Sequence, residues 1–201
     1  DGSMFGYITA REALTYSKNL TSIKTVDMLG LDTALNYGKK AGLKYAPQSH
    51  TMSALALGQF DQPIGNRDGG NTTILASAYG AFGNNGVIYE PALYTKVEDA
   101  SGNLLLEKEP ISTKLFSPQT SYIIYDILKG SSTSAQFNDI PVAGKTGTTN
   151  SSDNFWFAGL TPYYSGSVWI GYDNPQRMNG RSSSAASLFS KIMAVAHEGL
   201  E

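Results

Sequence analysis

The run AGKTGTTN, residues 143–150, places a lysine, two glycines and three threonine hydroxyls together directly after strand-like residues. A phosphate-binding loop of the form G-x-x-x-x-G-K-T is the first interpretation, but it requires a glycine where Asp139 stands. It also requires a helix that begins at the loop, whereas the residues that follow read as a loop and then a strand. The sequence therefore argues against nucleotide binding, and another ligand has to explain these residues.

Residues Lys145, Thr146, Gly147 and Thr148 suit a carboxylate-binding site if they lie on an edge strand. Alternation sends Lys145 and Gly147 to one face and Thr146 and Thr148 to the other, and local twist can bring neighbours together. The lysine supplies charge, the hydroxyls supply donors, and the glycine lets an extended ligand approach the backbone. The backbone N–H of Thr148 could form half of an oxyanion hole. The alternative without a binding function is an ordinary edge strand with a solvated lysine.

A second candidate element, YSKN, lies far upstream and places Ser17 and Asn19 two positions apart at a predicted helix end. A serine hydroxyl can pass a proton, and an asparagine amide can both donate to and accept from a peptide bond. The alternative is that both side chains only cap a helix, which these residue types do well. Each motif is weak alone, but the two in this order are far more specific.

The composition excludes several classes of function. The chain has 201 residues, 41 % of them apolar, which suffices for one sizeable domain core. A formal net charge of −2 without a basic stripe argues against nucleic-acid binding. The absence of cysteine excludes disulfides and thiolate catalysis. His50 and His197 are isolated and fit no ligand spacing, so we expect neither a metal nor another cofactor.

The elements that must position these motifs are predicted from periodicity and from capping residues. Helices are expected over residues 7–17, 22–29, 32–43 with Asp32 as N-cap, 71–86, 117–130 with Ser117 as N-cap and Pro118 in the first turn, and 184–199. Strands are expected as a hairpin over 94–107 and as three neighbours over 140–148, 155–160 and 167–173. Helices before and after a run of antiparallel strands indicate an α+β fold, an antiparallel sheet flanked by helices.

With these residues in place, the chain resembles the C-terminal part of the transpeptidase domain of class A, bifunctional penicillin-binding proteins. The family signature is S-x-x-K, then S-D-N or a relative, then K-T-G. Further support comes from the runs ITAREALTYSKN, AYGAFGNNGVIYEP, AGKTGTT and WFAGLTPYYSGSVWIGYD, which span nearly the whole length. The resemblance implies a β-lactamase/transpeptidase-like fold, with Ser17 and Asn19 as the second motif and Lys145–Thr148 as the third.

The sequence departs from the family at one point, because no serine is followed by a lysine three positions later. In the family that serine is the acylated nucleophile and the lysine its base, and a nucleophile needs its base within hydrogen-bond reach. We therefore expect residues 1–201 to be a partial domain without its nucleophile. A preceding segment or a companion chain would supply S-x-x-K, and the chain alone would be inactive.

The resemblance implies a serine D,D-transpeptidase that cross-links peptidoglycan stem peptides ending in D-Ala-D-Ala and that β-lactam antibiotics acylate. Ser17, Asn19 and Lys145 would be catalytic, and Thr146, Gly147 and Thr148 would bind substrate. A D,D-carboxypeptidase and a non-catalytic β-lactam sensor of the same fold stay open as alternatives. The expected location is the extracytoplasmic face of the bacterial membrane, anchored by segments outside this chain, which has no run of ~18 apolar residues.

Overall fold

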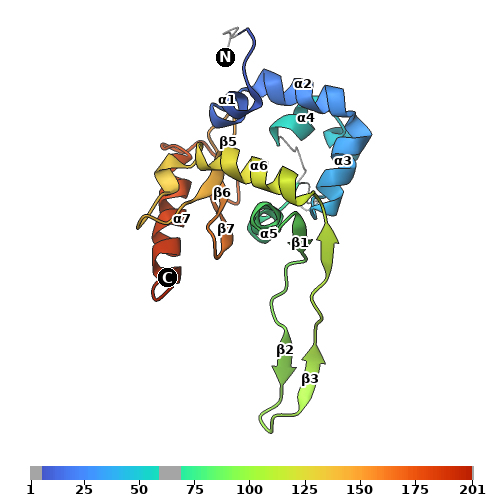
Figure 1. The fold of residues 1–201 in the computed structure, drawn as a ribbon, viewed down its shortest axis with the longest axis vertical. Coiled ribbons are helices and arrows are strands. Elements are labelled where there is room, and N and C mark those ends of the chain that lie inside the picture. The colour runs from blue at the N-terminus through green and yellow to red at the C-terminus, as the bar shows by residue number, and fades with distance from the viewer. Residues whose placement is uncertain (1–5, 59–68, 201) are drawn as a thin grey trace.

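The computed structural model describes residues 6–58 and 69–200, which form an α+β arrangement of helices around short antiparallel sheets (Figure 1). The α-helices are α1 Ala10–Thr15, α2 Asn19–Leu29, α3 Leu31–Lys40, α4 Met52–Leu57, α5 Thr72–Gly83, α6 Pro118–Lys129 and α7 Ser183–Ala196. The strands are β1 Val87–Tyr89, β2 Lys96–Glu98, β3 Leu104–Glu107, β4 Ser112–Lys114, β5 Ala143–Thr148, β6 Asn154–Leu160 and β7 Ser165–Gly171. Two short 3-10 turns, Pro47–Ser49 and Thr133–Ala135, complete the set.

The sheet that carries the Lys-Thr-Gly motif has the strand order β5-β6-β7, and both strand pairs are antiparallel. Helix α7 packs on one face of this sheet, and α5 and α6 pack on the other (Figure 1). The predicted three-stranded antiparallel sheet between helices is therefore confirmed. Strand order places β5 at a border of the sheet within the described residues.

Two hydrophobic clusters hold the helices against the sheet. Beneath α7, the Phe157 and Phe189 rings lie 4.8 Å apart and are fully buried with Val142. On the other face, Leu128 of α6 and Leu160 of β6 form a second cluster. Burying a side chain of this size stabilises a fold by about 1.5–3 kcal/mol. These two clusters therefore fix where the sheet lies relative to α6 and α7.

The sequence predicts an N-cap residue for two helices, and the structure confirms one of the two. Ser117 Oγ accepts from the Thr120 backbone N–H at 3.1 Å, so α6 begins where the sequence predicts. The N-cap of α3 is Gly30 and not Asp32, because Gly30 ends α2 with φ +87° and starts α3 at once. Asp32 instead lies in the first turn, where the helix dipole favours a carboxylate.

The predicted hairpin is present as β2 and β3, and it extends far from the rest of the molecule (Figure 1). A short ladder between β1 and β4 forms its base. Every side chain of β3 is exposed, and the side chain of Val97 in β2 is only half-buried. The hairpin is thus an arm outside the hydrophobic clusters. None of the described helices is both long and apolar enough to cross a bilayer.

Candidate active site

Lys145 lies in the middle of β5, on the strand that borders the sheet. It is in register with Ala158, whereas Thr146 is opposite Phe157, which packs beneath α7. Alternation therefore sends Lys145 and Gly147 toward the face covered by α5 and α6, and Thr146 and Thr148 toward the α7 face. This is the division expected from the sequence.

The ammonium of Lys145 reaches the turn between α1 and α2. Its Nζ donates a hydrogen bond to Ser17 Oγ and a second, longer one to the backbone carbonyl of Thr146 at 3.3 Å. The lysine of the later motif and the serine of the earlier one are thus in direct contact. Only tertiary packing makes this contact, because most of the chain separates the two residues.

The turn that presents Ser17 has an unusual backbone. Ser17 has φ +51°, in the left-handed region that non-glycine residues seldom occupy. The backbone N–H of Lys18 donates to the Ala13 carbonyl at 2.8 Å and closes the turn. Lys18 is the N-cap of α2, so Ser17 does not cap that helix, and Asn19 is the first helical residue with an exposed side chain.

An ion pair fixes α1, and with it this turn, on α6. Arg11 Nη2 lies 2.6 Å from Asp126 Oδ2, and Lys129 Nζ lies 3.0 Å from the other oxygen of the same carboxylate. Lys129 and then Arg11 hold the pKa of the Asp126 carboxyl below its usual value. Leu14 packs against the cluster that joins α6 to the sheet. Because α6 also contacts β5, these links determine the position of Ser17 relative to Lys145.

Burial sets the electrostatics of Lys145. Partial burial lowers the pKa of its ammonium below the ordinary value of 10.5, because a charged group loses hydration there. In the part of the chain that the structure describes, no carboxylate forms an ion pair with it. A cation with a hydroxyl partner and no local counter-ion can attract an anionic ligand.

Thr146 lines a separate pocket of about 300 Å³ on the α7 side of the strand. Hydroxyl groups from the loop after α6 and from the start of α7 share this pocket with the guanidinium-bearing side chain of Arg181. Ser131 Oγ donates to the Gly144 carbonyl at 2.8 Å, which ties that loop to β5. The hydroxyl of Thr146 thus faces a polar, cationic pocket, while Lys145 faces Ser17.

A hydrogen-bonded turn ends β5 immediately after Thr148. Thr149 Oγ1 donates to the Asp153 carboxylate and accepts from the Asn154 backbone N–H at 3.1 Å. Trp169 Nε1 donates to Asn154 Oδ1 at 2.7 Å, which extends the network to β7. Hydrogen bonds from Thr149, then Ser151 and Asn154, lower the pKa of the Asp153 carboxyl. Thr148 therefore ends the strand next to a turn that is held in one conformation.

Three contributors to this site were not predicted from the sequence: Arg11 with its partner Asp126, Arg181, and Asp153. No local pattern marks Arg11 or Asp126, which meet across 115 positions. The run 131–134, four serine and threonine residues after a predicted helix, was the sequence signal for the Arg181 pocket. Hydroxyl side chains in such a loop readily form hydrogen bonds with nearby backbone groups. The structure brings Ser17 and Lys145 together and directs Thr146 to the other face of the sheet. Asn19 lies two positions from Ser17 with an exposed side chain.

The chain is similar to known proteins along nearly its whole length. A family described as the penicillin binding protein transpeptidase domain matches residues 2–194. The chain belongs to the penicillin-binding protein transpeptidase family. Penicillin-binding protein 1A of Clostridium perfringens strain 13 is 52 % identical over 203 residues, which cover 98 % of this chain and 30 % of that protein. This member of the family therefore spans less than a third of that curated relative.

Solved structures show that this transpeptidase chain has the family fold. The D,D-transpeptidase domain of a peptidoglycan glycosyltransferase from Eggerthella lenta superposes with a TM-score of 0.74 at 22 % identity, covering 99 % of this chain and 56 % of that one. Penicillin-binding protein A of M. tuberculosis, solved as an imipenem acyl-enzyme complex, gives 0.73 at 17 % identity, covering 94 % and 48 %. The α+β, transpeptidase-like fold predicted from the sequence is confirmed.

Proposed function

We propose that this chain is the C-terminal part of a peptidoglycan D,D-transpeptidase domain that works through a serine acyl-enzyme. The observation that carries the proposal is the contact of Lys145 with Ser17. A partly buried ammonium without a counter-ion, held against a hydroxyl beside an open strand edge, suits proton transfer near a bound carboxylate. Membership of the transpeptidase family supports the same reaction.

The reaction is a two-step acyl transfer. A serine outside this chain attacks the penultimate carbonyl carbon of a stem peptide, and the C–N bond to the terminal D-alanine breaks. The lysine of S-x-x-K accepts the proton of the attacking serine, and Ser17 passes a proton from that lysine to the leaving nitrogen, with the Lys145 ammonium stabilising the charge that develops. An amine from a second stem peptide then attacks the ester, forms the new peptide bond and releases the serine with its proton restored.

The remaining motif residues hold the substrate. Asn19 binds the amide of the stem peptide, and the hydroxyls of Thr146 and Thr148 bind its terminal carboxylate across the strand border. Gly147 leaves room for the ligand backbone against β5. β-Lactams would occupy the same places with their carboxylate over the threonines. The imipenem acyl-enzyme complex of the M. tuberculosis protein, which has the same fold, supports acylation by β-lactams but not the individual contacts proposed here.

The nucleophile comes from a preceding segment or a companion chain that carries S-x-x-K, so residues 1–201 alone have no activity. No serine of the sequence has a lysine three positions later. This supports a nucleophile and base supplied from outside these residues. The complete protein would act at the extracytoplasmic face of the membrane through an anchor outside these residues.

A chimera tests this proposal. Residues 1–201 are joined to the preceding transpeptidase segment of the C. perfringens relative, and the product is incubated with a fluorescent penicillin. We expect covalent labelling of the chimera and none of residues 1–201 alone. Labelling of the isolated chain would show that the nucleophile has been misplaced, and failure of a folded chimera to label would contradict the proposal.

The role of Lys145 is tested in the same chimera. Lys145→Ala should slow acylation about 100-fold or more, since it removes a preorganised electrostatic group. Lys191→Ala, which removes an exposed lysine of α7, is the matched control and should label at the normal rate. Equal rates for both variants would exclude the role of Lys145. Transpeptidation and carboxypeptidation are distinguished by supplying the chimera with a stem peptide, with and without an amine acceptor. A cross-linked product with the acceptor indicates transpeptidation, and only a hydrolysed peptide indicates carboxypeptidation.

A further inference from the structure

The backbone groups at the outer edge of β5 belong to its even-numbered residues. The Thr149 N–H donates to the Asn154 carbonyl at 3.3 Å, and in the same register the odd-numbered residues of β5 pair with β6. Pairing alternates along an antiparallel strand, so the N–H and C=O groups of the residues between them point away from β6. Within the Lys-Thr-Gly motif, these residues are Thr146 and Thr148.

The loop after α6 already occupies this edge at the start of the strand. Ser131 Oγ donates to the Gly144 carbonyl at 2.8 Å, and Ser132 Oγ donates to the Val142 carbonyl at 2.5 Å. Both acceptors are even-numbered residues, so the loop bonds the edge positions that precede Thr146. A peptide that adds to β5 as a further strand can therefore pair along the motif but cannot continue toward Gly144. One end of such a ligand must lie beside Thr146.

The pocket beside Thr146, of about 300 Å³, is positively charged. Arg181 is the charged residue among the described residues that line it, and none of them is acidic. No carboxylate in the described part of the chain forms an ion pair with the Arg181 guanidinium. An amino terminus would be repelled by this cation, whereas a carboxylate would be attracted. The charge therefore favours a ligand that runs antiparallel to β5, since the end that it places beside Thr146 is its carboxyl terminus.

The other cation of the site, Lys145, serves the opposite face of the strand. Its side chain points away from that of Thr146, and its Nζ donates to Ser17 Oγ. A guanidinium also matches a carboxylate better than an ammonium does, because its planar donors can bind both oxygens in a bidentate manner. The two cations therefore have separate partners, a hydroxyl for Lys145 and a ligand carboxylate for Arg181.

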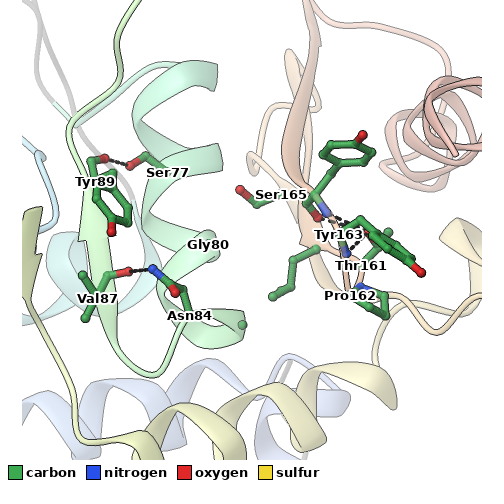
Figure 2. A pocket seen from close by; sticks show the side chains of 12 residues that line it. Ser77, Gly80, Asn84, Val87, Tyr89, Thr161, Pro162, Tyr163 and Ser165 are labelled. Atoms are coloured by element: carbon green, nitrogen blue, oxygen red, sulfur yellow. Dashed lines mark hydrogen bonds between the residues drawn. The ribbon is translucent and has the colours of Figure 1, made fainter. Parts of the chain in front are cut away.

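Another pocket, of about 350 Å³, lies between α5 and the turn that joins β6 to β7 and lacks such a charge (Figure 2). The described residues that line it include the polar Ser77, Asn84 and Ser165, but no aspartate, glutamate, lysine, arginine or histidine. An anion buried there would find no counter-charge, which is unfavourable. Of these two pockets, the one beside Thr146 is therefore the one that fits a carboxylate.

We propose that Arg181 is a specificity-determining residue that binds the free carboxylate of the ligand. Ser131 and Ser132 block the edge of β5, and the guanidinium holds the chain end that stops there. The bond attacked is then the last peptide bond of the ligand, one residue back toward Thr148. This inference rests on the proposed acyl transfer, because it assigns a further residue to the same ligand.

The test compares two ligands, benzylpenicillin with its free carboxylate and the same molecule with that group converted to a neutral carboxamide. Acylation of the chimera by each is followed by mass spectrometry of the intact protein. Arg181→Ala should slow acylation by the carboxylate form about tenfold, because a charge-assisted hydrogen bond is lost, and should leave acylation by the carboxamide unchanged. Arg181→Lys should restore part of the rate. Arg177→Ala, which removes an exposed arginine outside the pocket, is the matched control and should alter neither rate.

The ratio of the two acylation rates separates a specific role of Arg181 from a structural one, because a disturbed fold slows both reactions alike. An unchanged ratio in Arg181→Ala would overturn the inference and leave the proposed acyl transfer intact. An equal fall of the ratio in Arg177→Ala would also overturn it, since the effect would then come from overall charge. A folded chimera that neither penicillin acylates would contradict the proposed function, and this inference with it.

Discussion

At the scale of single residues, the site depends on where one ammonium is placed. Lys145 is removed from much of its hydration by burial, and its partner is the neutral hydroxyl of Ser17. The charged form is therefore less stable than in water, which lowers its pKa. Between the lowered pKa of Lys145 in the folded chain and its ordinary pKa in the unfolded chain, the unfolded chain binds more protons. The contribution of Lys145 to the free energy of unfolding therefore rises with pH in this interval.

This shift predicts the pH dependence of acylation. The ammonium of Lys145 loses its proton at a lower pH than a free lysine does. As the pH is raised, the rate of penicillin acylation of the chimera should therefore begin to fall before pH 10.5, the ordinary pKa of lysine. In Lys145→Arg the guanidinium stays charged, and the alkaline fall should disappear even if the rate is lower throughout. Rates measured by stopped-flow from pH 6 to pH 11 check this, and an unchanged alkaline limb in Lys145→Arg would assign the titration to another group.

At the scale of elements, β5 packs tightly against β6 near its start, at Gly144, but has more space beside it within the motif, at Gly147. A Cβ on Gly144 would meet the Phe157 ring and lie 2.7 Å from the Ala158 carbonyl oxygen. A Cβ on Gly147 would meet only Trp156 Cβ, at an ordinary 3.4 Å. The two glycines of one strand therefore differ: Gly144 permits close strand packing, and Gly147 leaves space that the proposed ligand would use.

The two alanine variants should separate stability from ligand binding. Gly144→Ala should lower the free energy of unfolding by about 1–3 kcal/mol, because the core beside Phe157 is overpacked. Gly147→Ala should change it by less than about 0.5 kcal/mol yet slow acylation, since a methyl group then meets the ligand backbone. Urea unfolding and penicillin labelling of the chimera measure both effects. Equal losses of stability in the two variants would contradict this distinction.

At the scale of the whole molecule, the β2–β3 arm is separate from the two hydrophobic clusters that hold the sheet. The Lys108 backbone N–H donates to the Thr95 carbonyl at 2.9 Å, so the arm starts and ends as a paired hairpin. The stability of the body should therefore not depend on the arm.

Replacing residues 96–107 by Asn-Gly, a favoured two-residue turn, tests this independence. We expect the thermal midpoint of the chimera to move by no more than about 2 °C, because a surface change of about 0.5 kcal/mol has an effect of this size. Circular dichroism measures the midpoint. A fall of many degrees would show that the arm packs against the body in the complete domain.

Local sequence determined most of the elements and the motif residues. Ser117 and Pro118 predicted where α6 begins, and alternating residues predicted the strands that became β5, β6 and β7, because caps and periodicity depend on neighbours in the chain. Short elements such as α4 and the β1–β4 ladder escaped prediction. Three-residue strands carry too little periodic signal to be recognised before their partner is known.

The sequence by itself determined that a lysine, a serine and a hydroxyl-rich strand are present, and in which order. Only the tertiary structure decided that Lys145 meets Ser17 and that Arg11 holds α1 on α6 through Asp126. Propensities and caps act over a few residues, whereas a contact across 128 positions depends on how α6 and the sheet bury their apolar faces together. The order of the residues therefore indicated the chemistry, whereas packing of the core fixed the geometry of the candidate site.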